Sequence, residues 1–317
     1  MKTKIIAVAG PTASGKTSLA IEIAKRISGE VISNDSMQIY KGMEIGTAAP
    51  TMEEMQGVPH HLIGIISPES EFSCSDYSAL AREKIEEITK RGRVPVFCGG
   101  TGLYLDSVLA RGEMSESEKD ESLRAELCEY AERHGADALH ERLSKADPEA
   151  ALSIHKNNVR RVVRALEIYL STGITKTEWD RRSTEAPLPY DVTMAVIDFA
   201  DREKLYARIG QRVDLMVKAG VVEEAMNIWK SGYLSGDKPC AQAIGYKEFV
   251  PYFEGEEALE TAIEAIKLNT RRYAKRQITW FKKYRDAIRL IPDSREGELK
   301  SAEQLACEFL ERSGFSV

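Results

Sequence analysis

Residues 10–17 read GPTASGKT and match the phosphate-binding pattern G-x-x-x-x-G-K-[ST] in full. The pattern stands between an apolar run at 5–9, which predicts a buried strand, and residues 17–27, whose apolar spacing predicts a helix. In such a loop the backbone N–H groups point inward, and the helix N-terminus adds the positive end of its dipole. The lysine reaches the terminal phosphate, and the hydroxyl that follows it can bind Mg²⁺. We therefore expect a phosphate site made of Gly10, Pro11, Thr12, Ala13, Ser14, Gly15, Lys16 and Thr17.

Strand and helix patterns alternate on the C-terminal side of this loop. Further strands are predicted at 30–33 and 94–98, with a helix at 75–91 between them. Such alternation favours a parallel sheet that helices cover on both faces. We predict an α/β fold with a P-loop NTPase-like core at 1–112 and 191–317. The second part of this core should contain a strand at 191–199 and helices at 202–219, 221–231, 256–285 and 301–312.

Residues 113–190 have a different character, because they contain no strand-like run. Leucines recur there at helical spacing, Asp147-Pro148 is a typical helix start, and residues 153–170 form an amphipathic helical pattern. Pro187 and Pro189 mark the return to the core. We predict that 113–190 is an all-helical insertion domain.

Composition restricts the cellular setting. Of the 317 residues, 43% are hydrophobic and 30% charged, a balance typical of soluble globular proteins. No run approaches the roughly 20 apolar residues that span a bilayer, and the apolar run at 5–9 is too short for a signal peptide. Five scattered cysteines without a C-x-x-C pair argue against a disulfide framework or a structural zinc site. We expect a cytoplasmic, monomeric protein without membrane contacts.

A carboxylate near the phosphate loop is the next candidate for chemistry. Nucleotide hydrolases usually carry an acid at the end of a hydrophobic strand, but the strand at 94–98 runs into Gly99-Gly100 instead. Asp35 comes shortly after the strand at 30–33. Because the carboxyl ends of parallel strands share one edge, Asp35 should face the P-loop across a crevice. The alternative is that Asp35 only caps a helix or closes a turn.

Arg208 and Arg212 lie four residues apart on a predicted helix and therefore share a face. Such a pair could close over an oxyanion-rich leaving group. The alternative is a solvated helix face that pairs with Asp214 or Glu203.

The net charge of −6 hides two basic regions. Residues 266–289 contain nine cations and one acid, a balance of +8, with aromatic side chains interleaved. A second cluster, Arg160, Arg161 and Arg164, lies beside Asn157 and Asn158. Cations together with aromatics suit a phosphate backbone and unpaired, stacked bases. In the alternative interpretation the aromatics are core residues and the cations are solvated.

Together these motifs resemble the bacterial tRNA dimethylallyltransferases (tRNA isopentenyltransferases). The resemblance runs in order from the P-loop to residue 283 and covers most of the chain. The segments that carry it are GPTASGKT at 10–17, ISNDSMQIYKGMEIGTAAP at 32–50, VPHHLIG at 58–64, GGTGLYLDSVL at 99–109, NVRRVVRALEIYLSTG at 158–173, AIGYKEF at 243–249 and TRRYAKRQITWFKK at 270–283. One departure is Asn34, which stands where a small apolar residue is expected before the aspartate.

The resemblance implies transfer of a dimethylallyl group from dimethylallyl diphosphate to N6 of adenosine 37 of a tRNA, beside the anticodon. It implies that the P-loop holds diphosphate rather than ATP, that Asp35 is the general base, and that Mg²⁺ on Thr17 and an arginine of the 208/212 pair stabilise the leaving group. The adenosine must leave its stack to react. The implied tRNA contacts are Asp35, Ser36, Met37, Gln38 and Thr101 around the target base, Asn158, Arg160, Arg161 and Arg164 of the insertion on the anticodon stem-loop, and Gly245, Tyr246, Lys247, Arg271, Arg272, Lys275, Arg276, Gln277 and Trp280 on the core.

Two other functions fit parts of the sequence. A P-loop small-molecule kinase, with Asp35 as the base for a hydroxyl acceptor, explains residues 1–112 but neither basic region. A non-catalytic RNA-binding ATPase explains the basic regions but assigns no chemistry to Asp35.

Overall fold

The computed structural model describes residues 2–109, 120–185, 188–236, 238–293 and 298–315. The chain forms two compact units, one made of Met1–Val108 with Tyr190–Val317, and the other of Leu109–Pro189. The expected boundary at residues 112 and 113 and the return at Pro187 lie outside the described residues. Each unit has its own hydrophobic core.

A six-stranded, all-parallel sheet organises the first unit, in the order β3-β2-β4-β1-β5-β6. The predicted parallel sheet flanked by helices is confirmed. Two short edge strands had no recognisable pattern, because two or three residues are too few to show a period. The strands are β1 Lys4–Ala9, β2 Gly29–Ser33, β3 His60–His61, β4 Val94–Gly99, β5 Asp191–Ile197 and β6 Ile288–Leu290.

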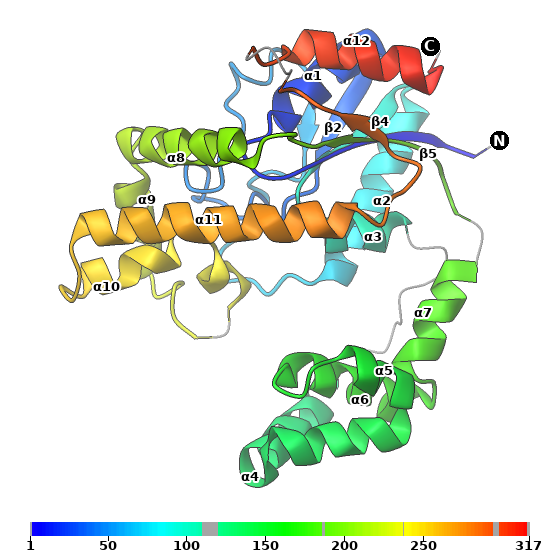
Figure 1. Cartoon of the computed structure of the whole chain (residues 1–317), viewed down its shortest axis with the longest axis vertical. Coiled ribbons are helices and arrows are strands. Elements are labelled where there is room, and N and C mark those ends of the chain that lie inside the picture. The colour runs from blue at the N-terminus through cyan, green and yellow to red at the C-terminus, as the bar shows by residue number, and fades with distance from the viewer. Residues whose placement is uncertain (1, 110–119, 186–187, 237, 294–297, 316–317) are drawn as a thin grey trace. The chain divides into compact units, whose positions relative to one another are not determined.

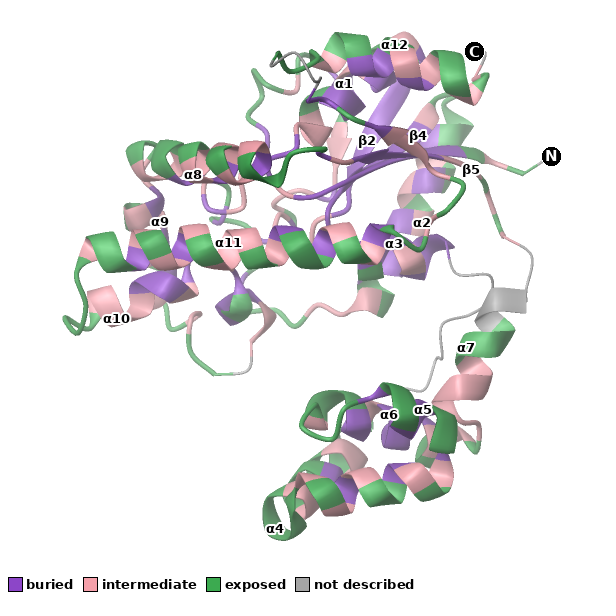
Figure 2. Cartoon of the chain, viewed as in Figure 1, coloured by how far each residue is buried: buried purple, intermediate pink, exposed green. Residues whose placement is uncertain are grey.

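Helices cover both faces of this sheet. Alternate residues of the central strands, such as Ile6 and Val8 of β1, are buried in one cluster with α1 (Lys16–Arg26) and α12 (Ala302–Ser313). On the other face lie α2 (Cys74–Lys90) and α3 (Gly102–Leu109), as Figure 1 shows. The central strands are buried over nearly their whole length (Figure 2). Burial on both faces explains why these strands read as continuous apolar runs.

A further group of helices follows β5 and lies near the P-loop side of the sheet. The long α11 runs alongside α8 (Figure 1). It is shorter than the pattern at 256–285 predicts, because the chain leaves the helix at Lys282 and turns into β6. These elements are α8 Arg202–Lys218, α9 Val221–Lys230, the 3₁₀ turns η1 Pro239–Gln242 and η2 Lys247–Phe249, α10 Val250–Phe253 and α11 Leu259–Phe281.

Within its described residues, the second unit contains helices joined by short connections and no strand. It consists of α4 Glu121–Ala146, α5 Pro148–Ser153, α6 Val159–Thr172 and α7 Lys176–Glu185. Asp147 caps α5 by accepting from the Ala150 N–H (3.0 Å) and accepts from the Thr177 hydroxyl at 2.7 Å, which ties α7 to the others. The helix predicted from residue 153 begins later, because Asn158 caps α6 and accepts from the Arg161 N–H at 3.4 Å.

Within the described residues, no helix is both long and apolar enough to cross a membrane.

Candidate active site

The P-loop follows β1 at the carboxyl edge of the sheet and leads into α1. Gly15 adopts the left-handed conformation (φ +92°) that turns the loop into the helix, a conformation that favours glycine. The Ser14 hydroxyl is buried and has no hydrogen-bond partner within the protein. The Arg208 Nε donates to the Ala13 carbonyl at 2.9 Å, so α8 is fastened to the loop. The loop therefore has the backbone conformation of an anion-binding loop, with the Arg208 guanidinium beside it.

Cations converge on this loop from two helices. Burial lowers the pKa of the Lys16 ammonium, and the like charge of Arg212 lowers it further. Burial also lowers the pKa of the Arg212 guanidinium, while the charge of Asp35 acts in the opposite direction. Like charges held close together without full solvation are expensive unless an anion joins them. The site is thus electrostatically prepared for a multiply charged anion.

Asp35 lies where both cations feel its charge, because its carboxylate offsets part of the fall in the pKa of Lys16 and of Arg212. One of its oxygens, Oδ1, accepts from the Met37 N–H at 2.9 Å. This bond closes a small turn, so the turn-forming alternative describes part of what Asp35 does. The turn also fixes the carboxylate beside the cations, which leaves its second oxygen available to a substrate.

The Gly99-Gly100-Thr101 turn fastens the segment that carries Asp35. The Asn34 N–H donates to the Cys98 carbonyl (2.8 Å), and the Thr101 N–H donates to the Asn34 carbonyl (3.1 Å). The Asn34 side chain, 1% exposed, adds a bond from Nδ2 to the Thr101 carbonyl at 3.2 Å. A small apolar residue could not make this third bond, which explains the asparagine. The Thr101 hydroxyl in turn accepts from the Ser36 N–H at 3.0 Å.

Tyr273 of α11 completes this corner. Burial raises the pKa of its hydroxyl to about 12, and the charge of Asp35 adds to the shift, while the neighbouring side chains of Thr101 and Gln277 act in the opposite direction. The phenol therefore stays protonated at neutral pH. It lies near enough to Asp35 to feel the charge of that carboxylate, and as a protonated phenol it cannot itself act as the base.

Three residues that the resemblance assigns to tRNA have their side chains committed inside the protein. Gln277 is 3% exposed and bonds to the Thr12 N–H and the Gly100 carbonyl. Tyr246 is fully buried, and its hydroxyl donates to Glu224 at 2.6 Å. Gln38 accepts from the Ser33 hydroxyl (2.8 Å) and donates to the Ala48 carbonyl (3.2 Å). These side chains shape the site from within.

The other core residues expected to contact tRNA lie closer to the surface. Arg272, Lys275 and Arg276 are exposed on α11, and Arg271, Trp280 and Met37 are half-buried. The Arg276 guanidinium lies over the Tyr273 ring at 5.5 Å, and Lys283 lies over Trp280 at 4.5 Å. Gly245 is buried next to the half-buried Lys247. The helix thus combines an aromatic inner side with a cationic outer side. The inner side agrees with the interpretation that the aromatics are core residues, and the exposed cations remain available for a phosphate backbone.

The insertion presents its cluster on α6. Arg160 and Arg161 are exposed, next to the capping Asn158. Arg164 is different, because it lies 3.1 Å from the buried Glu167, which also pairs with Arg124 at 2.9 Å. Part of this cluster therefore stabilises the insertion's own core.

Glu224 of α9 is a residue that the sequence patterns did not reveal. Its carboxylate accepts from the Ile45 N–H (2.9 Å), the Gly46 N–H (2.8 Å) and the Tyr246 hydroxyl. It therefore holds a loop whose Ala48 carbonyl accepts from Arg212 at 3.5 Å. Because its partners lie far away in the chain, no local pattern could have revealed this role.

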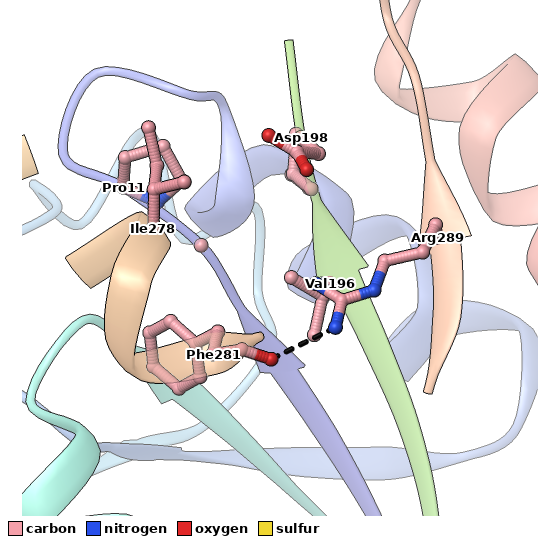
Figure 3. Close-up of a pocket in the computed structure, with 8 residues that line it drawn as sticks. Pro11, Val196, Asp198, Ile278, Phe281 and Arg289 are labelled. Atoms are coloured by element: carbon pink, nitrogen blue, oxygen red, sulfur yellow. Dashed lines mark hydrogen bonds between the residues drawn. The ribbon is translucent and has the colours of Figure 1, made fainter. Parts of the chain in front are cut away.

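Asp198 also lies beside the P-loop, and the sequence patterns did not single it out. It follows β5 directly, at the edge of the sheet where the P-loop lies. The apolar run before it indicates a strand end at this position. Figure 3 shows it at a small hollow beside Pro11, Ile278 and Phe281. Across the hollow, Arg289 donates to the Phe281 carbonyl at 2.8 Å. Because Ile278 and Phe281 line this hollow together with Gly10 and Pro11, the end of α11 lies beside the P-loop.

Fold and site together define a class of protein: a P-loop NTPase-like α/β protein with a cationic phosphate loop. The carboxylate beside this loop is Asp35, and the strand β4 does not end in the metal-binding acid of nucleotide hydrolases. The model of one family, described as IPP transferase, matches residues 38–284. The chain belongs to this IPP transferase family, as the sequence resemblance predicted.

Named relatives and solved structures agree with this membership. The chain is 50% identical over 282 residues to a tRNA dimethylallyltransferase of Halalkalibacterium halodurans, with 89% of each chain covered. It is 48% identical to that of Bacillus subtilis, covering 89% of this chain and 88% of the relative. A tRNA isopentenylpyrophosphate transferase structure from Bacillus halodurans has a TM-score of 0.70 at 43% identity, over 99% of this chain and 98% of that one. A eukaryotic dimethylallyltransferase acting on tRNA has a TM-score of 0.80 at 32% identity, over 91% and 74%.

Proposed function

We propose that this transferase moves the dimethylallyl group of dimethylallyl diphosphate to N6 of adenosine 37 in a tRNA. The observation that carries the proposal is the Asp35 carboxylate beside the cationic P-loop. A phosphate loop alone indicates an anion. A carboxylate held next to that loop supplies the group that a poorly nucleophilic amine needs, and the names of the relatives identify the amine's source as tRNA.

The leaving group takes up negative charge as the allylic C–O bond breaks. In this proposal Lys16, the Arg208 and Arg212 guanidinium groups and the loop N–H groups stabilise that charge. The Thr12 N–H already donates to Gln277 (2.8 Å) and the Ser14 N–H to the Pro11 carbonyl (3.4 Å), so the N–H groups of Ala13 and of residues 15–17 are proposed for the diphosphate. The bond electrons remain on the diphosphate oxygen, and the dimethylallyl carbon is taken by the nucleophile.

The nucleophile is the exocyclic amine of adenine, whose lone pair is delocalised into the ring. Asp35 accepts a hydrogen bond from N6–H and takes this proton as the C–N bond forms. Thr101, bonded to the backbone that carries Asp35, is suited to contact the same nucleotide. A base inside a duplex or stacked loop cannot reach these groups, so the adenosine must be turned out of its stack.

Mg²⁺ fits the donor set of the site. Among the described residues there is no cluster of three His, Cys, Asp or Glu side chains that could hold a metal ion. Mg²⁺ is commonly bound by one or two protein oxygens together with substrate phosphates, and the Thr17 hydroxyl is the oxygen that the P-loop offers. When bound, the ion would offset part of the diphosphate charge.

Two cationic surfaces are proposed for the tRNA. The exposed cations of α11 suit the nucleotides around the target base, and the exposed arginines of α6 suit the phosphate backbone of the anticodon stem-loop. In this division the insertion grips the stem-loop while the core performs the reaction.

Replacing Arg160 and Arg161 together with alanine is expected to weaken tRNA binding and to reduce its salt dependence. Each lost phosphate contact lowers the slope of log K against log[salt] by about one. The measurement is tRNA affinity between low and moderate salt. Arg164 is left in place because it pairs with the buried Glu167.

The matched control removes Arg133 and Lys145, two exposed cations of α4 in the same unit, each paired with a neighbouring acid. Both double variants lose two charges. An equal change in both salt slopes would contradict the assignment of α6, and so would a loss of pyrophosphate affinity in the first variant.

The proposed reaction is tested by offering labelled dimethylallyl diphosphate and, separately, γ-labelled ATP to the enzyme with Mg²⁺ and unmodified tRNA. We expect label to reach tRNA from dimethylallyl diphosphate only. Transfer of phosphate from ATP, with or without tRNA, would favour the kinase instead.

A further inference from the structure

Gln277 lies between the two halves of the reaction site. Its Oε1 accepts from the Thr12 N–H of the P-loop at 2.8 Å, and its Nε2 donates to the Gly100 carbonyl at 3.0 Å. The first partner belongs to the loop that is proposed to hold the diphosphate. The second belongs to the turn that fastens Asp35 and Thr101.

We propose that Gln277 is a positioning residue whose amide sets the separation between the diphosphate loop and the acceptor turn. The inference rests on the proposed function and adds a residue that acts through others and does not touch tRNA. It also replaces the tRNA contact that the family resemblance suggested for this side chain.

The chemistry of the two partners explains why an amide is required. A backbone N–H needs an acceptor and a backbone carbonyl needs a donor, and a primary amide supplies both at once. A carboxylate would satisfy Thr12 but would oppose the Gly100 carbonyl with a second acceptor. A methionine of similar length would leave both backbone groups without a partner. Because the amide is 3% exposed, water cannot easily substitute for it.

The surroundings of the amide leave it little freedom. A Cβ added to Gly100 would lie 1.9 Å from Nε2, and one added to Gly102 would lie 2.1 Å from the Trp280 ring. Both glycines therefore allow α11 to approach the turn closely. One turn earlier on α11, the Tyr273 hydroxyl lies near the side chains of Thr101 and Gln277. One residue later, Ile278 lies with Pro11 at the hollow in Figure 3.

Loss of the Gln277 bridge between Thr12 and Gly100 should lower turnover more than it weakens binding of the tRNA. Reacting groups must be held within a fraction of an ångström, and a displacement of about 1 Å can cost about 100-fold in rate. Gln277→Met is therefore expected to lower kcat by about 100-fold and to weaken pyrophosphate binding about tenfold. The affinity for tRNA should change less than about twofold, because the exposed cations of α11 are unaffected.

The test measures three quantities for Gln277→Met and the wild type: kcat, pyrophosphate affinity without tRNA, and tRNA affinity without donor. The matched control is Arg276→Met, at the exposed residue that directly precedes Gln277 on α11. It should weaken tRNA binding and leave the pyrophosphate affinity unchanged, which is the opposite of the result expected for Gln277→Met. Thermal unfolding of each variant establishes that the fold is present.

Gly100→Ala is a second variant that attacks the bridge from the other end and keeps the amide. Its added methyl group must displace Nε2, so the same loss of kcat and pyrophosphate affinity is expected. Weakened tRNA binding with unchanged pyrophosphate affinity in Gln277→Met would overturn the proposal and restore the RNA contact. Unchanged kcat and unchanged pyrophosphate affinity in folded Gln277→Met would also overturn it.

The pyrophosphate measurement needs no prenyl transfer. If the wild type transferred nothing to tRNA, the proposed function would fail, yet the effect of Gln277 on the loop would still be decided by binding alone.

Discussion

Replacing Asp35 with asparagine is expected to lower the rate of dimethylallyl transfer by about 100-fold to 10,000-fold, the range that a general base contributes. The substitution keeps the oxygen that accepts from the Met37 N–H, so the turn should survive. What is lost is the ability to take the proton from N6. The rate is measured in single turnover with saturating dimethylallyl diphosphate and tRNA, and tRNA affinity is measured separately.

Asp191→Asn is the matched control, because Asp191 is exposed and begins β5 at the opposite edge of the sheet from the P-loop. Its turnover should equal that of the wild type. If Asp35→Asn and Asp35→Ala also turned over normally, the general-base assignment would be wrong, and a non-catalytic RNA-binding protein would become the better description.

Replacing Lys16 with methionine is expected to lower kcat by about 100-fold to 1,000-fold, comparable to the loss of one donor that stabilises a developing anion. The side chain keeps its length but loses the charge that meets the diphosphate. Pyrophosphate affinity should fall as well, while tRNA affinity should not. The measurement is kcat together with pyrophosphate binding by calorimetry.

Stability separates this effect from misfolding. Burial and the neighbouring Arg212 lower the pKa of Lys16, which means that its charge is less favourable in the folded protein than in the unfolded chain. The Tm of Lys16→Met without ligand should therefore stay the same or rise. Lys25→Met, in the exposed last turn of α1, is the control and should change neither Tm nor turnover appreciably. A Lys16→Met variant with wild-type pyrophosphate affinity would contradict the assigned role.

The P-loop and the strands around it were predictable because each is a local pattern. A glycine-rich turn between an apolar run and a helix has few alternative conformations, and strand ends at one edge follow from parallel topology. The same reasoning placed Asp35 near the loop. It could not foresee that Asn34 also fastens the turn through Thr101, since that bond joins two separate strand ends.

The basic segment shows where sequence reasoning reaches its limit. Arg276 and Gln277 are neighbours in a run of polar residues, yet one is exposed and the other is buried against the P-loop. Composition cannot tell which face of a charged helix turns inward, particularly when the buried face carries an amide. The burial of Tyr246 was not foreseen for a related reason: its hydroxyl is satisfied by Glu224, a partner that only the tertiary fold supplies.

The central claim is most directly tested by nucleoside analysis of tRNA after incubation with the enzyme, Mg²⁺ and dimethylallyl diphosphate. The account predicts one new N6-dimethylallyladenosine per tRNA, at the adenosine beside the anticodon, with release of one diphosphate. Diphosphate release without this nucleoside, or the absence of any modified adenosine while the enzyme binds both substrates, would contradict it.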